Sequence, residues 1–72
     1  MIPNGFIEVT AISDVYKLLL RSDSVEACYD NPPQQLSYGV KPRFTTIEYS
    51  GHSIDVIEDY DSVKNMLWNA EL

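Results

Sequence analysis

The clearest hydrophobic pattern runs from residue 44 to residue 59, in the segment FTTIEYSGHSIDVIED. A two-residue turn at Ser50 and Gly51 would divide the segment into two strands, because glycine accepts the positive φ that hairpin turns need. The cross-strand pairs on the mostly apolar face are then Tyr49 with His52, Ile47 with Ile54, and Thr45 with Val56. The pairs on the mostly polar face are Glu48 with Ser53, Thr46 with Asp55, and the apolar pair Phe44 with Ile57. The pattern predicts a β-hairpin that covers a core with one side.

Three shorter segments before this hairpin also alternate. Residues 6 to 11 follow the breaker Pro3-Asn4-Gly5 and predict a strand. Residues 15 to 21 alternate as well, and a helix is the rival interpretation, but about seven residues between turn signals favour a strand. A turn at residues 22 to 24 would return the chain as a strand over residues 25 to 29. In that strand Val25, Ala27 and Tyr29 would share one side, with Glu26 and Cys28 facing away.

Residues 30 to 43, DNPPQQLSYGVKPR, hold three of the four prolines. Proline removes a hydrogen-bond donor from a strand ladder, so we expect a long mobile loop there. Tyr38, Lys41 and Arg43 combine an aromatic ring with two cations in this loop, which makes them candidates for contact with a partner.

The end of the chain predicts a helix that runs to about Ala70, with Asp59 or Asp61 as its N-terminal cap. Its apolar face comprises Val63, Met66, Leu67 and Ala70. Trp68 projects to the side of this face, where it either covers the sheet margin or lies exposed as an interface anchor.

Together these elements predict one α+β domain over residues 1 to 72, with the mobile loop at 30 to 43. The architecture is a small antiparallel β-sheet of four or five strands with one C-terminal α-helix packed on one face. The expected core residues are Ile7, Val9, Leu18, Leu20, Val25, Ala27, Ile47, Ile54, Val56, Val63, Met66 and Leu67.

The length of 72 residues limits the core, because a domain this small buries only about 60% of its unfolded surface. Such domains often need a disulfide, a metal or self-association. One cysteine and one histidine supply neither a disulfide nor a zinc site. Self-association remains, so we expect a homo-oligomer.

Composition also bears on location and partners. The single free Cys28, the start without a secretory signal and the lack of a membrane-length apolar run predict a soluble cytoplasmic protein with no membrane insertion. The net charge is −6, which argues against direct nucleic acid binding.

The chemistry-bearing side chains do not form a catalytic set. His52 has no orienting carboxylate on its own face, and Glu26 and Asp30 would raise the pKa of Cys28. Glu58, Asp59 and Asp61 suit helix capping better than a cation loop. The sequence predicts no enzyme, no cofactor and no metal site.

Several short stretches of the chain share an order and spacing with a known family, namely Ile7-Glu8-Val9-Thr10, Val25-Glu26, Thr45-Thr46-Ile47, Gly51, Val56-Ile57-Glu58 and Val63. In these stretches the chain resembles the FlbD-like family of small flagellar and swarming-motility proteins. The chain departs from the family at Arg21, where members typically have Asn, and in its longer middle loop. The resemblance implies a cytoplasmic, non-enzymatic accessory protein without a cofactor.

Three functions are therefore open. The first is a non-catalytic interaction module, or accessory regulator, that self-associates and binds another protein, with Trp68 and the loop as contacts. The second is an acidic inhibitor of the anti-defence type carried by phages or mobile elements, which mimics nucleic acid through Glu48, Asp55, Glu58, Asp59 and Asp61. Residues 44 to 72 hold six acids and one lysine, which supports this alternative. The third is an oligomeric nucleotide binder that uses Tyr38, Lys41 and Arg43.

Overall fold

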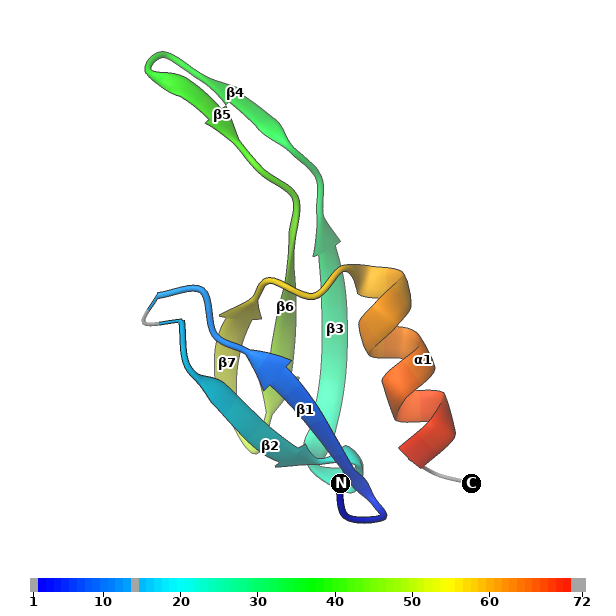
Figure 1. The fold of residues 1–72 in the computed structure, drawn as a ribbon. Coiled ribbons are helices and arrows are strands. Elements are labelled where there is room, and N and C mark those ends of the chain that lie inside the picture. Colours follow the sequence, from blue (N-terminus) through cyan, green and yellow to red (C-terminus); the bar gives the residue numbers. More distant parts are fainter. Residues whose placement is uncertain (1, 14, 71–72) are drawn as a thin grey trace.

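The computed structural model describes residues 2–13 and 15–70 and has the predicted α+β fold, with antiparallel strands and one C-terminal helix (Figure 1). The strands are β1 (Phe6–Thr10), β2 (Lys17–Arg21), β3 (Val25–Asn31), β4 (Gln34–Leu36), β5 (Gly39–Lys41), β6 (Phe44–Tyr49) and β7 (His52–Val56). A 3₁₀ turn, Ser22–Ser24, joins β2 to β3, and the helix α1 spans Tyr60–Ala70.

The main strands form two antiparallel sheets instead of the single sheet that the sequence predicts. One sheet contains β1 and β2, and the other has the order β3, β6, β7. They meet where Ala11 bridges Val56. Backbone hydrogen bonds flank this bridge, from Ile12 N–H to Asp55 O (3.0 Å) and from Ile57 N–H to Thr10 O (3.0 Å). The helix packs against β1, β3 and β6 (Figure 1).

The hairpin of β6 and β7 has the register predicted from the sequence. Its pairs run from Thr45 with Val56 to Tyr49 with His52. Ser50 and Gly51 both have positive φ, 48° and 80°, as a tight hairpin turn requires. The predicted pair of Phe44 with Ile57 lies outside this ladder, which ends at Thr45 with Val56. The Ile57 N–H points outward and bonds to Thr10 O.

The core lies between the two sheets and α1. Its buried apolar side chains are Ile7, Val9, Ala11, Leu20, Ile47, Val56 and Val63. Around it pack partly buried side chains, namely Leu18, Val25, Cys28, Tyr49, Ile54, Met66, Leu67 and Ala70. Every predicted core residue except Ala27 is in one of these two sets.

The prediction for the two sides of β3 is wrong because the strand contains a register shift. Val25 pairs with Tyr49, and Ala27 pairs with Glu48, the next residue of β6. Two steps along β3 therefore match one step along β6, so β3 contains one residue more than its partner at this point. A bulge of this kind reverses which side chains face the core. Cys28, which was expected to face away, therefore packs against the core with Val25.

The prediction of a loop without regular structure is wrong for residues 34 to 41. β4 and β5 form an antiparallel hairpin there, and β3 continues to Asn31. The three prolines lie between strands, at positions 32, 33 and 42, so no ladder hydrogen bond is lost. We call residues 32 to 43 the arm. It extends away from the two sheets and the helix (Figure 1), and the molecule measures 43 × 25 × 21 Å.

Glu58, in the connection between β7 and α1, forms hydrogen bonds that link this connection to β1 and β6. Its carboxylate accepts hydrogen bonds from the Thr10 N–H (2.8 Å) and the Thr10 hydroxyl (2.9 Å). Its backbone carbonyl accepts a bond from the hydroxyl of Thr45, which is fully buried (2.7 Å). Glu58 therefore joins β1, β6 and the entry to α1.

We expect Glu58→Ala to lower the free energy of unfolding by about 2 kcal/mol, because two hydrogen bonds to a charged acceptor are lost and the Thr10 donors are left without it. Urea unfolding followed by circular dichroism measures the change. Asp61→Ala is the matched control, since it removes an acid whose ion pair with Lys64 is exposed. Equal stabilities of the two variants would contradict the structural role of Glu58.

Candidate interaction surface

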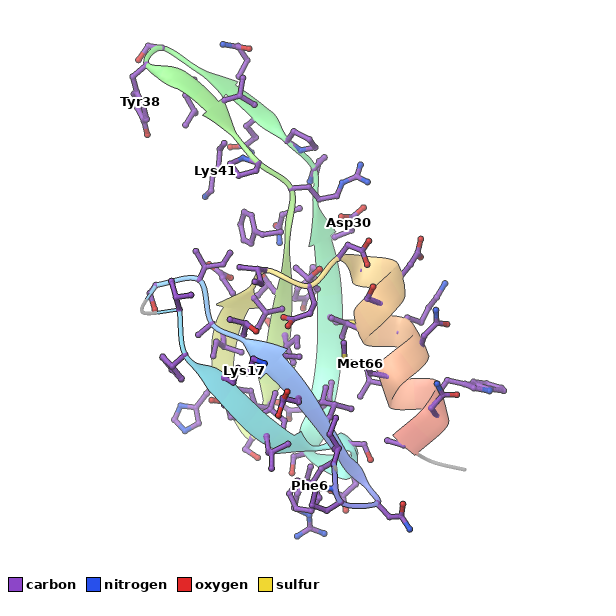
Figure 2. The ribbon with its side chains drawn as sticks, in the orientation of Figure 1. Phe6, Lys17, Asp30, Tyr38, Lys41 and Met66 are labelled. Carbon is purple, nitrogen blue, oxygen red and sulfur yellow. The ribbon has the colours of Figure 1, made fainter. Side chains whose placement is uncertain are left out.

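The arm presents apolar and aromatic side chains to solvent. Its strands pair Gln34 with Lys41, Gln35 with Val40, and Leu36 with Gly39. Tyr38, at the tip, exposes 88% of its surface, and Val40 exposes 62%. Figure 2 places Tyr38 at the end of the arm that is farthest from the body, with Lys41 nearer the body. An isolated two-stranded hairpin is marginally stable in water, so contact with another surface would stabilise the arm.

A hollow of about 350 Å³ lies where the arm joins the body. We call its lining the arm-base patch, which consists of Ile12, Lys41, Pro42, Arg43, Phe44 and Ile57. Ile57 exposes 56% of its surface and Ile12 exposes 39%. These side chains come from three separate parts of the chain, and together they form an apolar surface with cations beside it.

Charges of both signs surround the arm-base patch. Lys41 Nζ lies 4.6 Å from the centroid of the Phe44 ring, and Arg43 Nε lies 3.6 Å from Asp30 Oδ1. Asp59 caps α1 by accepting a hydrogen bond from the Ser62 N–H (2.8 Å). Hydrogen bonds from Ser62 hold the pKa of Asp59 below its ordinary value, and the positive charge of Arg43 lowers it further. The patch thus has cations and carboxylates as close neighbours.

The structure separates Tyr38 from the two cations that the sequence groups with it. Tyr38 lies at the tip of the arm, whereas Lys41 and Arg43 lie at its base and each already has a partner, Phe44 and Asp30 respectively. One chain therefore does not gather these three side chains into a ligand pocket.

The five candidate acids do not form one continuous surface. Glu48 and Asp55 lie on the outer side of β6 and β7, where Asp55 accepts a hydrogen bond from Thr46 (2.8 Å). A hydrogen bond to Glu48 and the negative charge of Glu48 raise the pKa of Tyr29. Glu58 is bonded to Thr10, Asp59 caps the helix, and Asp61 pairs with Lys64 at 3.8 Å. Most of these carboxylates are thus engaged in local structure.

Trp68 exposes 69% of its surface, so it does not cover the sheet margin. It lies near the C-terminal end of α1, which points away from the arm (Figure 1). Its role as an interface anchor stays a prediction.

His52 and Cys28 have surroundings that account for them without catalysis. The exposed His52 ring lies 6.0 Å from the Tyr49 ring, in the predicted cross-strand pair. Burial raises the pKa of Cys28 and the charge of Lys64 opposes the shift, so the direction agrees with the sequence prediction but its cause differs. A neutral, partly buried thiol is a poor nucleophile.

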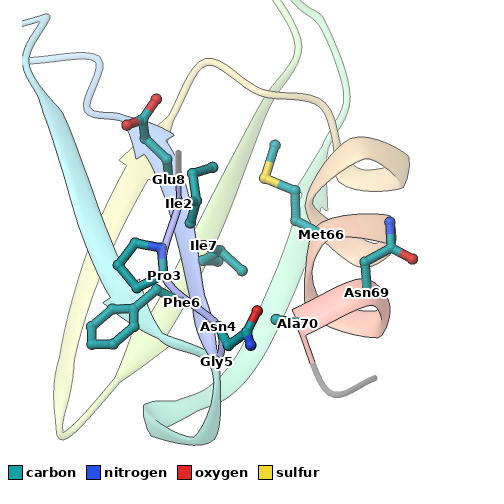
Figure 3. Close-up of a pocket in the computed structure, with 10 residues that line it drawn as sticks. All are labelled: Ile2, Pro3, Asn4, Gly5, Phe6, Ile7, Glu8, Met66, Asn69 and Ala70. Atoms are coloured by element: carbon teal, nitrogen blue, oxygen red, sulfur yellow. The ribbon is translucent and has the colours of Figure 1, made fainter.

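A second hollow, of about 260 Å³, separates the N-terminal segment from α1 (Figure 3). Its lining includes Ile2, Phe6, Met66 and Asn69. Glu8, the one ionisable side chain among the described lining residues, forms an ion pair with Lys17 at 3.8 Å. Within residues 2–13 and 15–70, no three metal-ligating side chains are grouped, and no helix is long and apolar enough to span a membrane.

Comparison with family models, curated proteins and solved structures finds no match to this chain. The resemblance to FlbD-like proteins therefore stays a prediction that rests on the residues quoted above.

The arm-base patch is the feature that sequence reasoning missed. Phe44 and Ile57 gave a signal, because they formed the one apolar pair on the otherwise polar face of the predicted hairpin. Ile12 gave none, since its place beside them depends on the meeting of the two sheets.

The cap at Asp59 predicts a pH effect on stability. Because the pKa of Asp59 is lowered by folding, its contribution is present above the unfolded value of 3.8 and is lost as pH falls through the folded pKa. We expect Asp59→Asn, which keeps a capping oxygen but does not titrate, to show a smaller loss of stability between about pH 5 and pH 2.

Urea midpoints measured across this range give the comparison. Asp61→Asn removes a neighbouring acid and leaves the Asp59 bond in place, so its urea midpoint should change with pH as that of the wild type does. If the midpoint of Asp59→Asn also follows the wild type, the cap carboxylate does not contribute to the pH dependence of stability.

Proposed function

We propose that this protein is a non-catalytic interaction module that self-associates and binds another protein. One observation carries the proposal. The molecule has both an arm that exposes Tyr38 and Val40 and an apolar hollow at the base of that arm. We place the function in the cytoplasm, because the one cysteine of the chain is a free thiol.

The occupant that we propose for the hollow is a second copy of the chain. If two arms align antiparallel about a two-fold axis, the tip of each arm reaches the base of the other. Residues 38 to 44 span about 20 Å in extended conformation, so this alignment brings Tyr38 of one copy to Phe44 and Ile57 of the other. A tyrosine ring suits such a site, because it is largely apolar and keeps its hydroxyl at the wet rim.

Charge supports the same occupant. In a two-fold interface the same patch occurs on both sides, so it must be complementary to itself. Arg43 lies beside Asp30 and Asp59, so this cation of each copy would face carboxylates of the other. Two chains of net charge −6 otherwise repel each other, and this patch is where opposite charges reduce that repulsion.

The arm is needed to reach a stable interface area. A specific interface typically buries about 800 Å² on each partner, which the side chains of Ile12, Phe44 and Ile57 do not provide by themselves. Side-by-side arms add the surfaces of Tyr38 and Val40 on both copies.

We expect wild-type protein to be a dimer in light scattering, and Tyr38→Ala and Ile57→Asp each to weaken the dimer at least about tenfold, as truncation of a central anchor does. Trp68→Ala is the matched control, since it removes an exposed aromatic ring far from the arm. Circular dichroism establishes that each variant is folded.

The same series can contradict the proposal. If the wild-type protein is a monomer at the highest soluble concentration, the proposal of self-association is wrong. A dimer that dissociates in Trp68→Ala but not in Tyr38→Ala would place the interface on α1 and remove the arm from it.

The acidic inhibitor and the nucleotide binder stay predictions that the geometry does not favour. The first needs a continuous row of free acids, and the second needs Tyr38 close to Lys41 and Arg43 in one pocket.

A further inference from the structure

The outer edge of β2 carries backbone groups that have no strand partner within residues 2–13 and 15–70. Among the described residues, β2 pairs with β1 alone. The phase of the ladder follows from the Ala11 N–H to Tyr16 O bond (2.9 Å) and the Ser22 N–H to Gly5 O bond (2.8 Å). Because hydrogen-bonded and non-hydrogen-bonded pairs alternate in antiparallel sheets, Leu18 and Leu20 also bond to β1. The peptide groups of Lys17, Leu19 and Arg21 therefore point outward.

The side chains at these three positions form a defined pattern. Lys17, Leu19 and Arg21 share one face by strand alternation, and all three are exposed, Leu19 by 46%. Their sequence along the edge is cation, aliphatic, cation, in a molecule whose net charge is −6. Lys17 and Arg21 pair with Glu8 (3.8 Å) and Asp23 (3.0 Å), but these ion pairs are exposed, contribute little stability and are readily exchanged for others.

We propose that the β2 edge binds an extended segment of another protein whose sequence alternates as acidic, any residue, aliphatic, any residue, acidic. The segment would add as a strand, with its backbone bonded to Lys17, Leu19 and Arg21. Its aliphatic side chain would lie beside Leu19 and its acids beside the two cations. This inference identifies the partner class for the protein-binding half of the proposed function, and it rests on that function.

A second copy of the chain does not suit this edge. Two β2 strands paired antiparallel around Leu19 would set Lys17 of one copy opposite Arg21 of the other, and like charges directly opposite are destabilising. Cations on an edge strand commonly prevent such self-pairing. The same cations attract an acidic strand, so the edge discriminates between the two occupants.

The test uses the full chain and a capped seven-residue peptide, TETVTET, titrated by NMR. We expect the largest shifts and the greatest gain in amide protection at Lys17, Leu19 and Arg21, whose amides point outward. The charge-reversed peptide TKTVTKT should bind at least about tenfold more weakly, since both end contacts become repulsive. A TETVTET peptide with N-methyl groups on its two glutamates and its valine should not bind, because the backbone N–H groups that face β2 are then missing.

Protein variants separate the edge from general charge. Lys17→Glu should weaken TETVTET binding about fivefold, and Lys64→Glu, with the same change in net charge on α1, should weaken it less than twofold. In the double variant Lys17→Glu/Arg21→Glu, TKTVTKT should become the better ligand. Equal weakening by Lys17→Glu and Lys64→Glu, binding of the methylated peptide, or no shift at residues 17, 19 and 21 would each overturn the inference.

Light scattering of the same samples distinguishes this failure from failure of the proposed function. If the protein is a dimer that does not bind the peptide, only the proposal for the β2 edge is wrong. If it is a monomer that binds the peptide, self-association is wrong and the proposal for the β2 edge stands.

Discussion

The fold depends on the hydrogen bonds that converge on Glu58. In the part of the chain that the structure describes, the backbone ladders of the two sheets are joined by one isolated bridge, between Ala11 and Val56, so few backbone hydrogen bonds connect them. Glu58 adds bonds to Thr10 at the end of β1 and to the buried Thr45 of β6, on either side of that bridge. Glu58 also lies two residues before the start of α1 at Tyr60, and Asp59 between them caps the helix. The helix then delivers Val63 to the core between the sheets.

The sequence predicted the elements whose signals are local. The register of β6 and β7 follows from alternation and from the turn at Ser50 and Gly51, and the cap at Asp59 follows from its side chain. The bulge in β3 was not predictable. It changes which residues pair across the strands, and so reverses the two faces beyond it, without a distinctive pattern in the sequence. The strands of the arm are not evident from the sequence, because proline within a strand removes a ladder hydrogen bond and here the prolines lie between the strands.

The candidate surface was less predictable than the fold. Residue type alone groups Tyr38 with Lys41, and the structure places both on the arm, but at different distances from the body (Figure 2). Ile12, Phe44 and Ile57 meet only because the sheets join at Ala11, a long-range contact without a local signal. The acids were selected for charge, yet Glu58 and Asp59 act in local structure. Charge alone did not distinguish a carboxylate that holds the fold from one that is free to bind.

Both proposed surfaces use strands that contribute little to the core. The arm has no buried side chain, and β2 contributes Leu20 and part of Leu18 while its outer edge and Leu19 face solvent. Regions with few buried contacts change at small cost in global stability, so they are available for binding. The arm leaves the body from β3 and β6, whereas β2 lies on the other sheet, so neither surface is built from residues of the other. A dimer formed through the arms would therefore present two β2 edges. A partner with two acidic strands that reach both edges would bind this dimer more tightly than a partner with one such strand.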